Sequence, residues 1–405
     1  MTPRRPREED FTSPLRDNRV TSRVGLWLGI AFLVAFLTGV FSHYGQDTPG
    51  WFTYPTGPVS IYRVTQGLHV LAGTAAIPLL LVKLWSVYPK LFSRLPWPPS
   101  REAAIQAVER LSIGVLVASA VFQLVTGLQN TTHWYPWGFS FRSTHYAVAW
   151  VAIGSILVHV AVKLPIIRQA LPQPLDEPAE PVATREPSMS GSGSGAHSMA
   201  APSTSAPGVL SRRGLLRATY AAAGLAVLAA AGQSVSWLRE VSIFGVRSGE
   251  GPQGVPVNRS AEEAGVVDSA MDPAWQLTLA YGSTTMKLSL ADLEAMPQRT
   301  RSLPISCVEG WSAGATWTGV PVADLVARLG APAESDVFVT SLESSGAFST
   351  STLPPQFSSH PDTLLALQLH GEALDIQHGY PARIIAPARP GVLQTKWVTG
   401  LEVLS

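Results

Sequence analysis

Long apolar stretches separated by short polar connections occupy the first half of the chain. Four of them, residues 24–41, 62–87, 111–128 and 143–164, approach or exceed the roughly 20 residues that a helix needs to cross about 30 Å of hydrocarbon. The alternative for each stretch is a buried helix of a large soluble protein. The pattern predicts an all-α transmembrane four-helix bundle over residues 24–168.

Lysine and arginine are distributed unevenly around these stretches. The connections 42–61 and 130–141 contain neither residue, whereas the tail 1–23 and the connection 88–110 contain several. Because basic residues remain on the cytoplasmic side of a membrane, residues 1–23 are predicted to be a cytoplasmic tail. Both ends of the bundle then lie inside, and the two aromatic-rich connections lie at the outer surface.

Two segments separate the bundle from the rest of the chain. Residues 169–210 are crowded with Pro, Ser, Ala and Gly and are predicted to be a disordered cytoplasmic linker, because they cannot bury enough apolar surface. Residues 211–235 begin with Arg212 and Arg213 and continue with an alanine-rich apolar run. This order resembles a twin-arginine export signal, and it equally fits positive-inside anchoring of a fifth membrane helix. Both interpretations place the following residues outside the cytoplasm. We expect residues 211–235 to be retained as a membrane anchor and not cleaved off.

Short β-like runs broken by turns characterise residues 250–405. Runs such as 275–279 and 397–403 are rich in aromatic, β-branched and leucine residues. Residues 289–292 have the composition of a helix capping box, and residues 321–329 begin with proline and stop before a glycine, as short helices do. This segment is predicted to be a separate α+β domain, so the whole chain is multi-domain.

Composition agrees with a membrane protein that carries a soluble portion. Of the 405 residues, 46% are hydrophobic and only 14% are charged. The formal net charge of +1 offers no electrostatic basis for binding nucleic acid, and we expect none as a partner. We expect a multi-pass protein of the cell membrane whose α+β domain lies on the extracytoplasmic side.

Three histidines lie inside the predicted membrane helices, where an ionisable side chain is costly and usually functional. His69 is in the second stretch, and His145 and His159 are in the fourth. The second and fourth helices both run inward, which puts His69 and His145 at matching depth, where two imidazoles can share one haem iron. Hydrogen bonding between helices is the alternative. His159 would bind a second haem, but residues 23–27 offer no partner histidine, so one haem is better supported than two.

This placement of histidines is similar to that in the cytochrome b subunits of formate dehydrogenase and nickel–iron hydrogenase, which implies haem b. His43 and His133 near the outer surface are alternative haem ligands or simply solvated side chains. Arg63 and Arg142 flank the outer haem position and are candidates to pair with haem propionates.

Cys307 is the only cysteine of the chain. A single thiol excludes an intramolecular disulfide and a zinc cluster, so Cys307 is either buried packing or one soft metal ligand. Its motif Ser-Cys-Val-Glu-Gly-Trp-Ser at 306–312 resembles the molybdenum-ligating segment of the sulfite oxidase family. The motifs His-Gly-Tyr-Pro-Ala-Arg at 378–383, Pro-Gly at 390–391 and Thr-Lys-Trp-Val at 395–398 follow in that family's order.

The resemblance implies a sulfite oxidase-type domain that binds the molybdenum cofactor, molybdopterin. By this likeness Cys307 is the catalytic thiolate ligand of molybdenum, and three further residues, His378, Arg383 and Lys396, bind the pterin and its phosphate. Such charge-assisted donors suit a dianionic phosphate. Because the chain ends directly after the last predicted strand, we expect no dimerisation domain. The likeness is then closest to the catalytic subunit of bacterial periplasmic methionine sulfoxide reductase.

The two resemblances together predict a membrane-bound molybdopterin-dependent oxidoreductase of the oxygen-atom-transfer type, with sulfoxide reduction as one candidate reaction. We expect electrons to pass through haem b to or from a membrane quinone, and the substrate to be a small oxidised or reduced sulfur or nitrogen compound. Two alternatives stay open: a sulfite dehydrogenase-like oxidase, and a haem membrane protein whose outer domain is not catalytic. Arg299 and Arg301 are the candidates for substrate binding.

Overall fold

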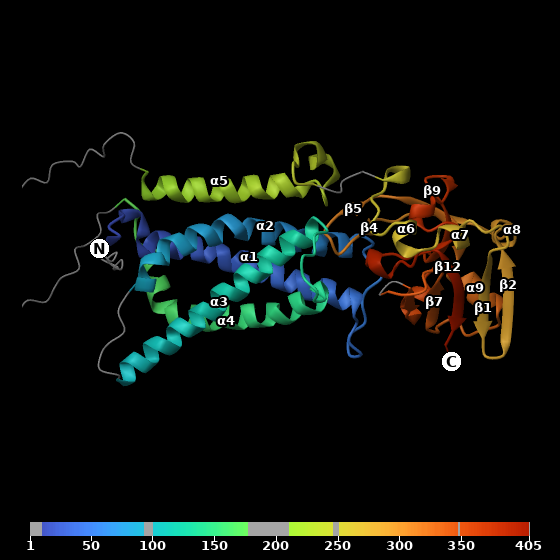
Figure 1. Ribbon diagram of the computed structural model, residues 1–405, viewed down its shortest axis with the longest axis horizontal. Coiled ribbons are helices and arrows are strands. Elements are labelled where there is room, and N and C mark those ends of the chain that lie inside the picture. The colour runs from blue at the N-terminus through green and yellow to red at the C-terminus, as the bar shows by residue number, and fades with distance from the viewer. Residues whose placement is uncertain (1–9, 93–99, 177–209, 246–250, 347–348, 405) are drawn as a thin grey trace, which may run out of the picture.

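The computed structural model describes residues 10–92, 100–176, 210–245, 251–346 and 349–404. The molecule is elongated, with long helices at one end and a β-rich domain at the other (Figure 1). Most of the predicted linker 169–210 lies outside the described residues. Helices α1–α5 and the turns at their ends are called the helical region below, and the described residues after 250 are called the β domain.

Five long helices form the helical region. Their bounds are α1 (Asn18–Gln46), α2 (Ile61–Val87), α3 (Arg101–Thr131), α4 (Phe141–Ala170) and α5 (Arg212–Ala231). Each is long and apolar enough to cross a membrane by length and composition. The four apolar stretches of the sequence lie one each within α1–α4, and α1, α3 and α4 extend beyond their apolar stretches at both ends.

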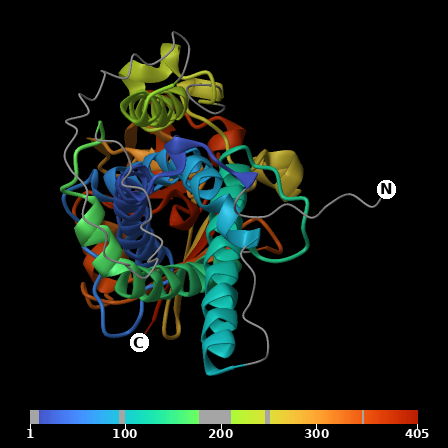
Figure 2. The ribbon, with the colours of Figure 1, turned by 90° about the vertical axis from the view of Figure 1, so that its left-hand side faces the viewer.

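The helices pack against one another along their length. α1 packs along α2 and α4, α3 packs along α4, and α5 packs along α2. A view along the helices shows α5 beside the group formed by the other four, not within it (Figure 2). Large apolar side chains point outward, for example Leu37 at 58%, Leu157 at 64% and Leu225 at 66% exposed. A surface of this kind is compatible with a membrane protein.

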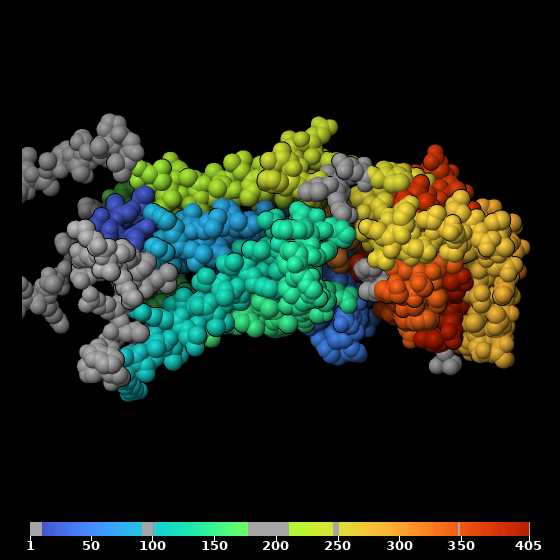
Figure 3. Space-filling view, viewed as in Figure 1, coloured from blue at the N-terminus to red at the C-terminus, as the bar shows by residue number. Residues whose placement is uncertain are grey.

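The β domain lies against the helix ends that carry the α1–α2 and α3–α4 connections (Figures 1 and 3). The start of α1, the end of α4 and the start of α5 lie at the opposite end. The two connections next to the β domain are those without lysine or arginine. The β domain therefore has the position relative to the helix ends that the charge pattern predicts.

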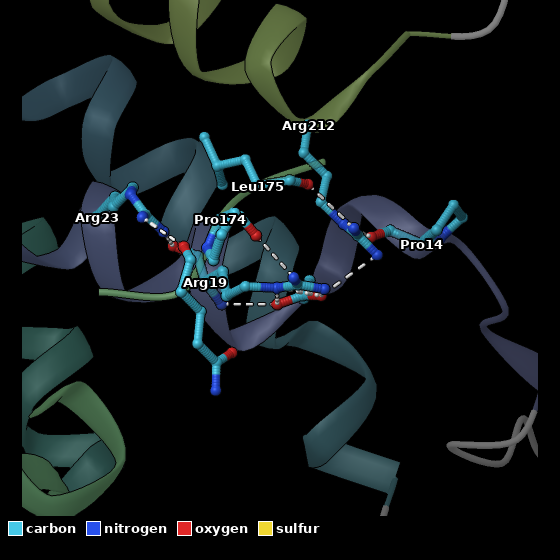
Figure 4. Close-up of polar contacts among 8 residues, drawn as sticks. Pro14, Arg19, Arg23, Pro174, Leu175 and Arg212 are labelled. Carbon is cyan, nitrogen blue, oxygen red and sulfur yellow. Dashed lines mark hydrogen bonds and ion pairs between the residues drawn. The ribbon is translucent and has the colours of Figure 1, made fainter. Parts of the chain in front are cut away.

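A cluster of polar contacts joins the helices at the end far from the β domain (Figure 4). Asp17 caps the start of α1 and pairs with Arg19 at 2.9 Å and with Arg212 at 3.3 Å. Arg212 also donates to the carbonyl oxygens of Pro14 and Leu175, each at 3.1 Å. These contacts tie the first residue of α5 to the segments beside α1 and α4.

Two five-stranded sheets and one short hairpin build the β domain. The first sheet has the order β2 (Thr284–Ser289), β1 (Gln276–Tyr281), β12 (Val398–Val403), β7 (Val337–Ser341), β8 (Thr350–Leu353). The second has the order β10 (Glu372–Ala373), β9 (Leu364–Leu369), β6 (Thr316–Pro321), β3 (Arg299–Ser302), with β11 (Arg383–Ile385) paired to β9. Strands β4 (Ile305–Ser306) and β5 (Ser312–Ala313) form the hairpin. β1 and β12 run parallel, and the other pairs are antiparallel.

Short helices connect these strands. They are α6 (Ala261–Ala264), α7 (Val267–Ala270), α8 (Leu290–Glu294), α9 (Val322–Arg328) and α10 (Pro355–Ser358), with 3-10 turns that include Pro252–Gly254, Ile376–His378 and Gly391–Leu393. The predicted capping box is present at α8, where Ser289 accepts from the Asp292 amide at 3.2 Å and Asp292 accepts from the Ser289 amide at 2.8 Å. The prediction of an α+β domain is confirmed.

One of the apolar clusters of the β domain continues into the helical region. Leu277 of β1, Val339 of β7 and Leu401 of β12 are buried in it. Tyr54 from the α1–α2 connection and Tyr62 from α2 belong to the same cluster, and each is only 1% exposed. The two parts of the chain therefore share a contiguous core, and neither is complete at this junction without the other.

Gly319 in β6 is expected not to tolerate a side chain. A Cβ atom there would lie 2.1 Å from the carbonyl oxygen of Leu365 and 2.6 Å from Cα of Ala366 in β9, and paired backbones cannot separate cheaply. We expect Gly319→Ala to lower the free energy of unfolding by about 3 kcal/mol or more, measured as a lower Tm. Gly314→Ala, where nothing lies within 4 Å, is the control. Equal Tm values for both variants would contradict this strand packing.

Candidate functional site

Cys307 follows β4 directly and begins a tight turn. The Gly310 amide donates to the Cys307 carbonyl at 3.1 Å, and the Cys307 amide donates to the Trp311 carbonyl at 3.0 Å. Gly310 has φ +96°, a left-handed conformation that favours glycine. The glycine of the motif thus lets the chain reverse directly after the thiol, and Cys307 is held in the interior at 3% exposure.

A pocket beside this turn, named the Cys307 pocket here, is lined by Cys307, Arg383 and Lys396 among others. The Pro-Gly motif closes one side of it. A Cβ atom on Gly391 would lie 2.8 Å from the carbonyl oxygen of Ser306, so only glycine lets this loop approach the hairpin so closely. Motifs far apart in the sequence therefore meet around one thiol.

Arg383 and Lys396 are buried cations held by neutral carbonyl groups. Lys396 Nζ donates to two backbone carbonyl oxygens, at 2.6 and 3.0 Å, and the Arg383 guanidinium donates to two more, at 3.0 and 3.1 Å. The Nε atom of Arg383 is buried without a hydrogen-bond partner. Burial lowers the pKa of Lys396 to about 7 and that of Arg383 to about 9. Such buried cations are the electrostatic complement of an anion, so the pocket fits a pterin phosphate.

His378 lies near the Cys307 pocket but its ring is held by another segment. Its Nε2 atom lies 2.7 Å from the carbonyl oxygen of Pro252, and the ring does not line the Cys307 pocket. Burial lowers its pKa to about 4, so the ring is neutral at physiological pH. Its backbone carbonyl accepts from Arg383 at 3.0 Å. His378 therefore positions Arg383, and its contact with a pterin stays a prediction.

Sequence reasoning missed an ion pair at the Cys307 pocket. Arg259 and Glu343 both line it, and their side chains approach to 2.8 Å, with Glu343 almost fully buried. Glu343 follows the carboxyl end of β7, where functional side chains are often placed, and that is the one signal that could have indicated it. Arg389 was also missed: it is buried, donates only to carbonyl oxygens, and burial lowers its pKa to about 9.

Arg299 and Arg301, the candidates for substrate binding, do not reach the Cys307 pocket. Both lie on β3, where Arg299 donates to the carbonyl oxygen of Pro361 at 3.0 Å and Arg301 pairs with Asp362. Proximity to Cys307 in the sequence was misleading, because β3 turns these side chains toward the 361–362 loop.

A second pocket, named the helix pocket here, lies within the helical region and brings His69 and His145 together. Their ring centroids are 6.1 Å apart and their planes are inclined by 75°. His69 Nδ1 lies 2.7 Å from the Ala35 carbonyl oxygen, and His145 Nδ1 lies 3.1 Å from Thr126 Oγ1. Both Nδ1 atoms are thus engaged, which leaves Nε2 of each ring for a metal. With metal–nitrogen bonds of about 2 Å on each side, two imidazoles on one iron have centroids roughly 6 Å apart, so the residues fit a haem.

The other histidines have different surroundings. His43 lines the helix pocket and stacks on Tyr146 with a centroid separation of 3.7 Å. His133, in the α3–α4 connection, lies 3.5 Å from a carboxylate oxygen of Glu309, next to the Cys307 turn. His159 does not line the helix pocket. Among these histidines, only His69 and His145 lie ring to ring in the helix pocket with Nδ1 of each ring engaged and Nε2 left for a metal.

The two arginines near the outer end of the helices also differ. Arg142 lines the helix pocket, where it stays a candidate partner for a haem propionate. Arg63 instead donates to the carbonyl oxygen of Ser234, at 3.0 Å from Nη2, and does not line the pocket.

Residues 264–405 match the family described as Oxidoreductase molybdopterin binding domain. The matched segment contains Cys307 and every residue assigned above to the Cys307 pocket except Asn258 and Arg259, which lie just before it. The prediction of a molybdopterin-binding oxidoreductase domain is confirmed for this segment.

Several known proteins are similar in sequence to part of this chain. A protein of Azospira oryzae, provisionally named protein-methionine-sulfoxide reductase subunit YedZ1, is 29% identical over 123 residues, covering 28% of this chain and 43% of that protein. The protein-methionine-sulfoxide reductase catalytic subunit MsrP of Xanthomonas axonopodis pv. citri is 32% identical over 136 residues, covering 28% and 40%. Mitochondrial sulfite oxidase of Mus musculus is 27% identical over 152 residues, covering 31% and 28%. The chain spans less than half the length of these three relatives.

Lys396 is expected to make the stability of the cofactor-free protein depend on pH. Its pKa is about 7 in the folded protein, against 10.5 for an ordinary lysine. Between these values the unfolded chain binds one more proton, so the free energy of unfolding rises with pH. We expect Tm to rise between about pH 7 and pH 9, and Lys396→Met to remove most of that rise.

Lys287→Met, on the exposed face of β2, is the control for this measurement and is expected to keep the rise. A pH profile of Lys396→Met that coincides with the control would show that the Lys396 ammonium is not the buried group responsible.

Proposed function

We propose that the chain is a membrane-bound, molybdopterin-dependent oxidoreductase with its own haem-binding electron carrier. The observation that carries this is the Cys307 pocket, where one buried thiol and two cations, Arg383 and Lys396, line the same cavity and both cations donate to carbonyl oxygens. A thiolate is the soft donor that molybdenum takes, and the cations suit the phosphate of its pterin. When bound, the cofactor supplies two-electron oxygen-atom transfer.

In this proposal the residues of the Cys307 pocket bind and orient the cofactor. Cys307 would hold the metal, and Lys396 and Arg383 would hold the pterin phosphate through charge-assisted hydrogen bonds. Phosphate would also restore the charged state of Lys396, because an adjacent anion raises the pKa that burial has lowered. The protein thus contributes a charge-matched, water-poor site for the cofactor.

A cytochrome b-like four-helix bundle over residues 24–168 is the second part of the proposal. His69 and His145 would bind haem b through their Nε2 atoms, and Arg142 would pair with a propionate. A haem iron exchanges one electron at a time, so it can link two-electron chemistry in the β domain to a quinone in the membrane. His159 has no comparable partner in the helix pocket, which favours one haem over two.

The proposed location is the cell membrane, with the β domain on the extracytoplasmic side. Support comes from five helices of spanning length and from the basic residues at the helix ends far from the β domain. Residues 211–235 would act as a twin-arginine-like signal and remain as the fifth membrane helix. The buried contacts of Arg212 with Asp17 favour retention, because they make the start of α5 part of the fold.

Sulfoxide reduction is the reaction we favour within this class. A sulfoxide is neutral, whereas sulfite is an anion that needs uncompensated positive charge near the metal. Arg259 lines the Cys307 pocket, but Glu343 neutralises it at 2.8 Å, and the two deeper cations fit the cofactor phosphate. The pocket therefore offers little charge for sulfite, and the MsrP relative is named for a sulfoxide substrate.

Cys307→Ser is expected to abolish molybdenum binding. Serine keeps the size of the side chain but replaces the soft sulfur donor with a hard, protonated oxygen. Purified wild-type protein is expected to contain close to one molybdenum per chain by elemental analysis, and the variant almost none. A wild-type protein without molybdenum would refute the enzyme proposal and leave a non-catalytic β domain.

His69→Ala is expected to remove the haem absorbance. The variant loses one of two axial ligands and opens a cavity next to Ala35, whose carbonyl oxygen now contacts the ring. The measurement is the reduced-minus-oxidised spectrum of the purified protein. His159→Ala, outside the helix pocket, is the matched control and is expected to keep the spectrum. A spectrum that survives His69→Ala would show that the ligand assignment is wrong.

A further inference from the structure

Two consecutive residues of the Cys307 turn belong to two different pockets. Cys307 lines the Cys307 pocket in the β domain, and Val308 lines the helix pocket that contains His69 and His145. A single peptide bond therefore joins a residue of one pocket to a residue of the other. The covalent path between the two sites at this point is as short as a polypeptide allows.

Two amide side chains of the helical region hold the next peptide, Val308–Glu309, in place. Gln66 Nε2 and Asn130 Nδ2 both donate to the carbonyl oxygen of Val308, each at 2.9 Å. Both side chains belong to buried residues that line the helix pocket, and Gln66 lies one helical turn before His69 on α2. The Tyr135 hydroxyl donates to Asn130 Oδ1 at 2.8 Å, which fixes the orientation of that amide.

The rest of the turn is fixed against the helical region as well. The Ser312 amide donates to the carbonyl oxygen of Gln233 at 2.8 Å, and Ser234 Oγ donates to the carbonyl oxygen of Gly310 at 2.7 Å. A Cβ atom on Gly310 would lie 2.7 Å from Cγ2 of Val70, so α2 touches the turn directly. The Cys307 turn thus has little freedom to move away from the helix pocket.

We propose that Gln66 and Asn130 are positioning residues: they hold Val308 through its carbonyl oxygen, so that the Cys307–Val308 bond beside it serves as the electron path between the metal site and the haem site. This rests on the proposed function. One amide donor would be enough to satisfy a buried carbonyl oxygen. Two donors from different helices use both of its lone pairs and so fix the orientation of the Val308 carbonyl. Neither amide bonds Cys307 itself, which lines the Cys307 pocket on the other side of the turn.

The electrons balance in the direction of sulfoxide reduction. Each passage through the peptide moves one electron from the haem site to the metal site, and two passages supply the two electrons that one sulfoxide consumes. With two protons the sulfur–oxygen bond is broken, and a thioether and water are released. One membrane quinol, which loses two electrons one at a time together with two protons, restores the haem for both passages.

The test compares the double variant Gln66→Leu/Asn130→Leu with Gln106→Leu, an exposed amide on α3, as matched control. The haem is reduced beforehand, and its reoxidation by methionine sulfoxide is followed by stopped-flow absorbance. We expect the double variant to be slower by about tenfold or more, as small misplacements of reacting groups commonly produce. Molybdenum content, the haem spectrum and haem reduction by a quinol analogue are expected to match the control.

A second readout needs no cofactor. In cofactor-free protein the buried thiol of Cys307 is expected to react faster with a maleimide once the two amides are removed, and the Gly310 amide to exchange its hydrogen faster. If the double variant does not fold, Asn130→Asp, which keeps the shape but removes the donor, replaces it. Faster labelling with unchanged electron transfer would overturn the proposal and leave a purely structural contact. A wild-type haem that methionine sulfoxide never reoxidises would instead overturn the proposed function.

Discussion

The contact between the Cys307 turn and the helix ends fixes how the two halves of the chain are joined. A backbone carbonyl cannot be buried without donors, and that of Val308 finds both of its donors on α2 and α3 rather than within the β domain. Tyr54 and Tyr62 fill the core of the β domain from the same side. The helical region is therefore part of the site that holds Cys307, and not merely an anchor for it.

Buried positive charge places a second constraint on the β domain. Arg383 and Arg389 are buried and Lys396 is half-buried, with carbonyl groups as their hydrogen-bond partners, which is costly until an anion is bound. A domain of this kind gains stability when it folds around an anionic cofactor. If the cofactor is inserted in the cytoplasm, the domain must then cross the membrane in folded form. The paired arginines at the start of α5 are consistent with the export route proposed above.

The sequence predicts those features that depend on local pattern. Apolar length was enough to place α1–α4, and the capping box at Ser289 was confirmed because it involves only neighbouring residues. The motif around Cys307 was informative because two of its residues have separate local roles: the glycine permits the tight turn, and the thiol is a soft donor for a metal. The closeness of His69 and His145 followed from the direction of the two helices, which the charge pattern gives, and from the position of each histidine within its apolar stretch.

The features that sequence reasoning missed depend on packing between distant segments. Nothing near Arg301 in the sequence shows that Asp362 will pair with it, and nothing near Arg259 points to Glu343. The ring of His378 turns to the carbonyl oxygen of Pro252 for the same reason, because that segment passes over it only in the folded chain. Motifs of a family indicate which residues gather at a site, but they do not distinguish a residue that lines the site from one that supports it.

Helix α5 is held at both of its ends, which bears on the proposal that it is retained and not cleaved. At its start, Arg212 pairs with Asp17; just beyond its end, Gln233 and Ser234 hold the Cys307 turn. Arg63 of α2 in turn donates to the Ser234 carbonyl oxygen, so the segment just after α5 is bound to α2 as well. Cleavage within α5 would separate the Arg212–Asp17 pair from the contacts of Gln233 and Ser234. The Cys307 turn would then lose its link to the rest of α5. Retention of α5 is therefore what keeps the thiol of Cys307 and the two facing histidines in one fixed arrangement.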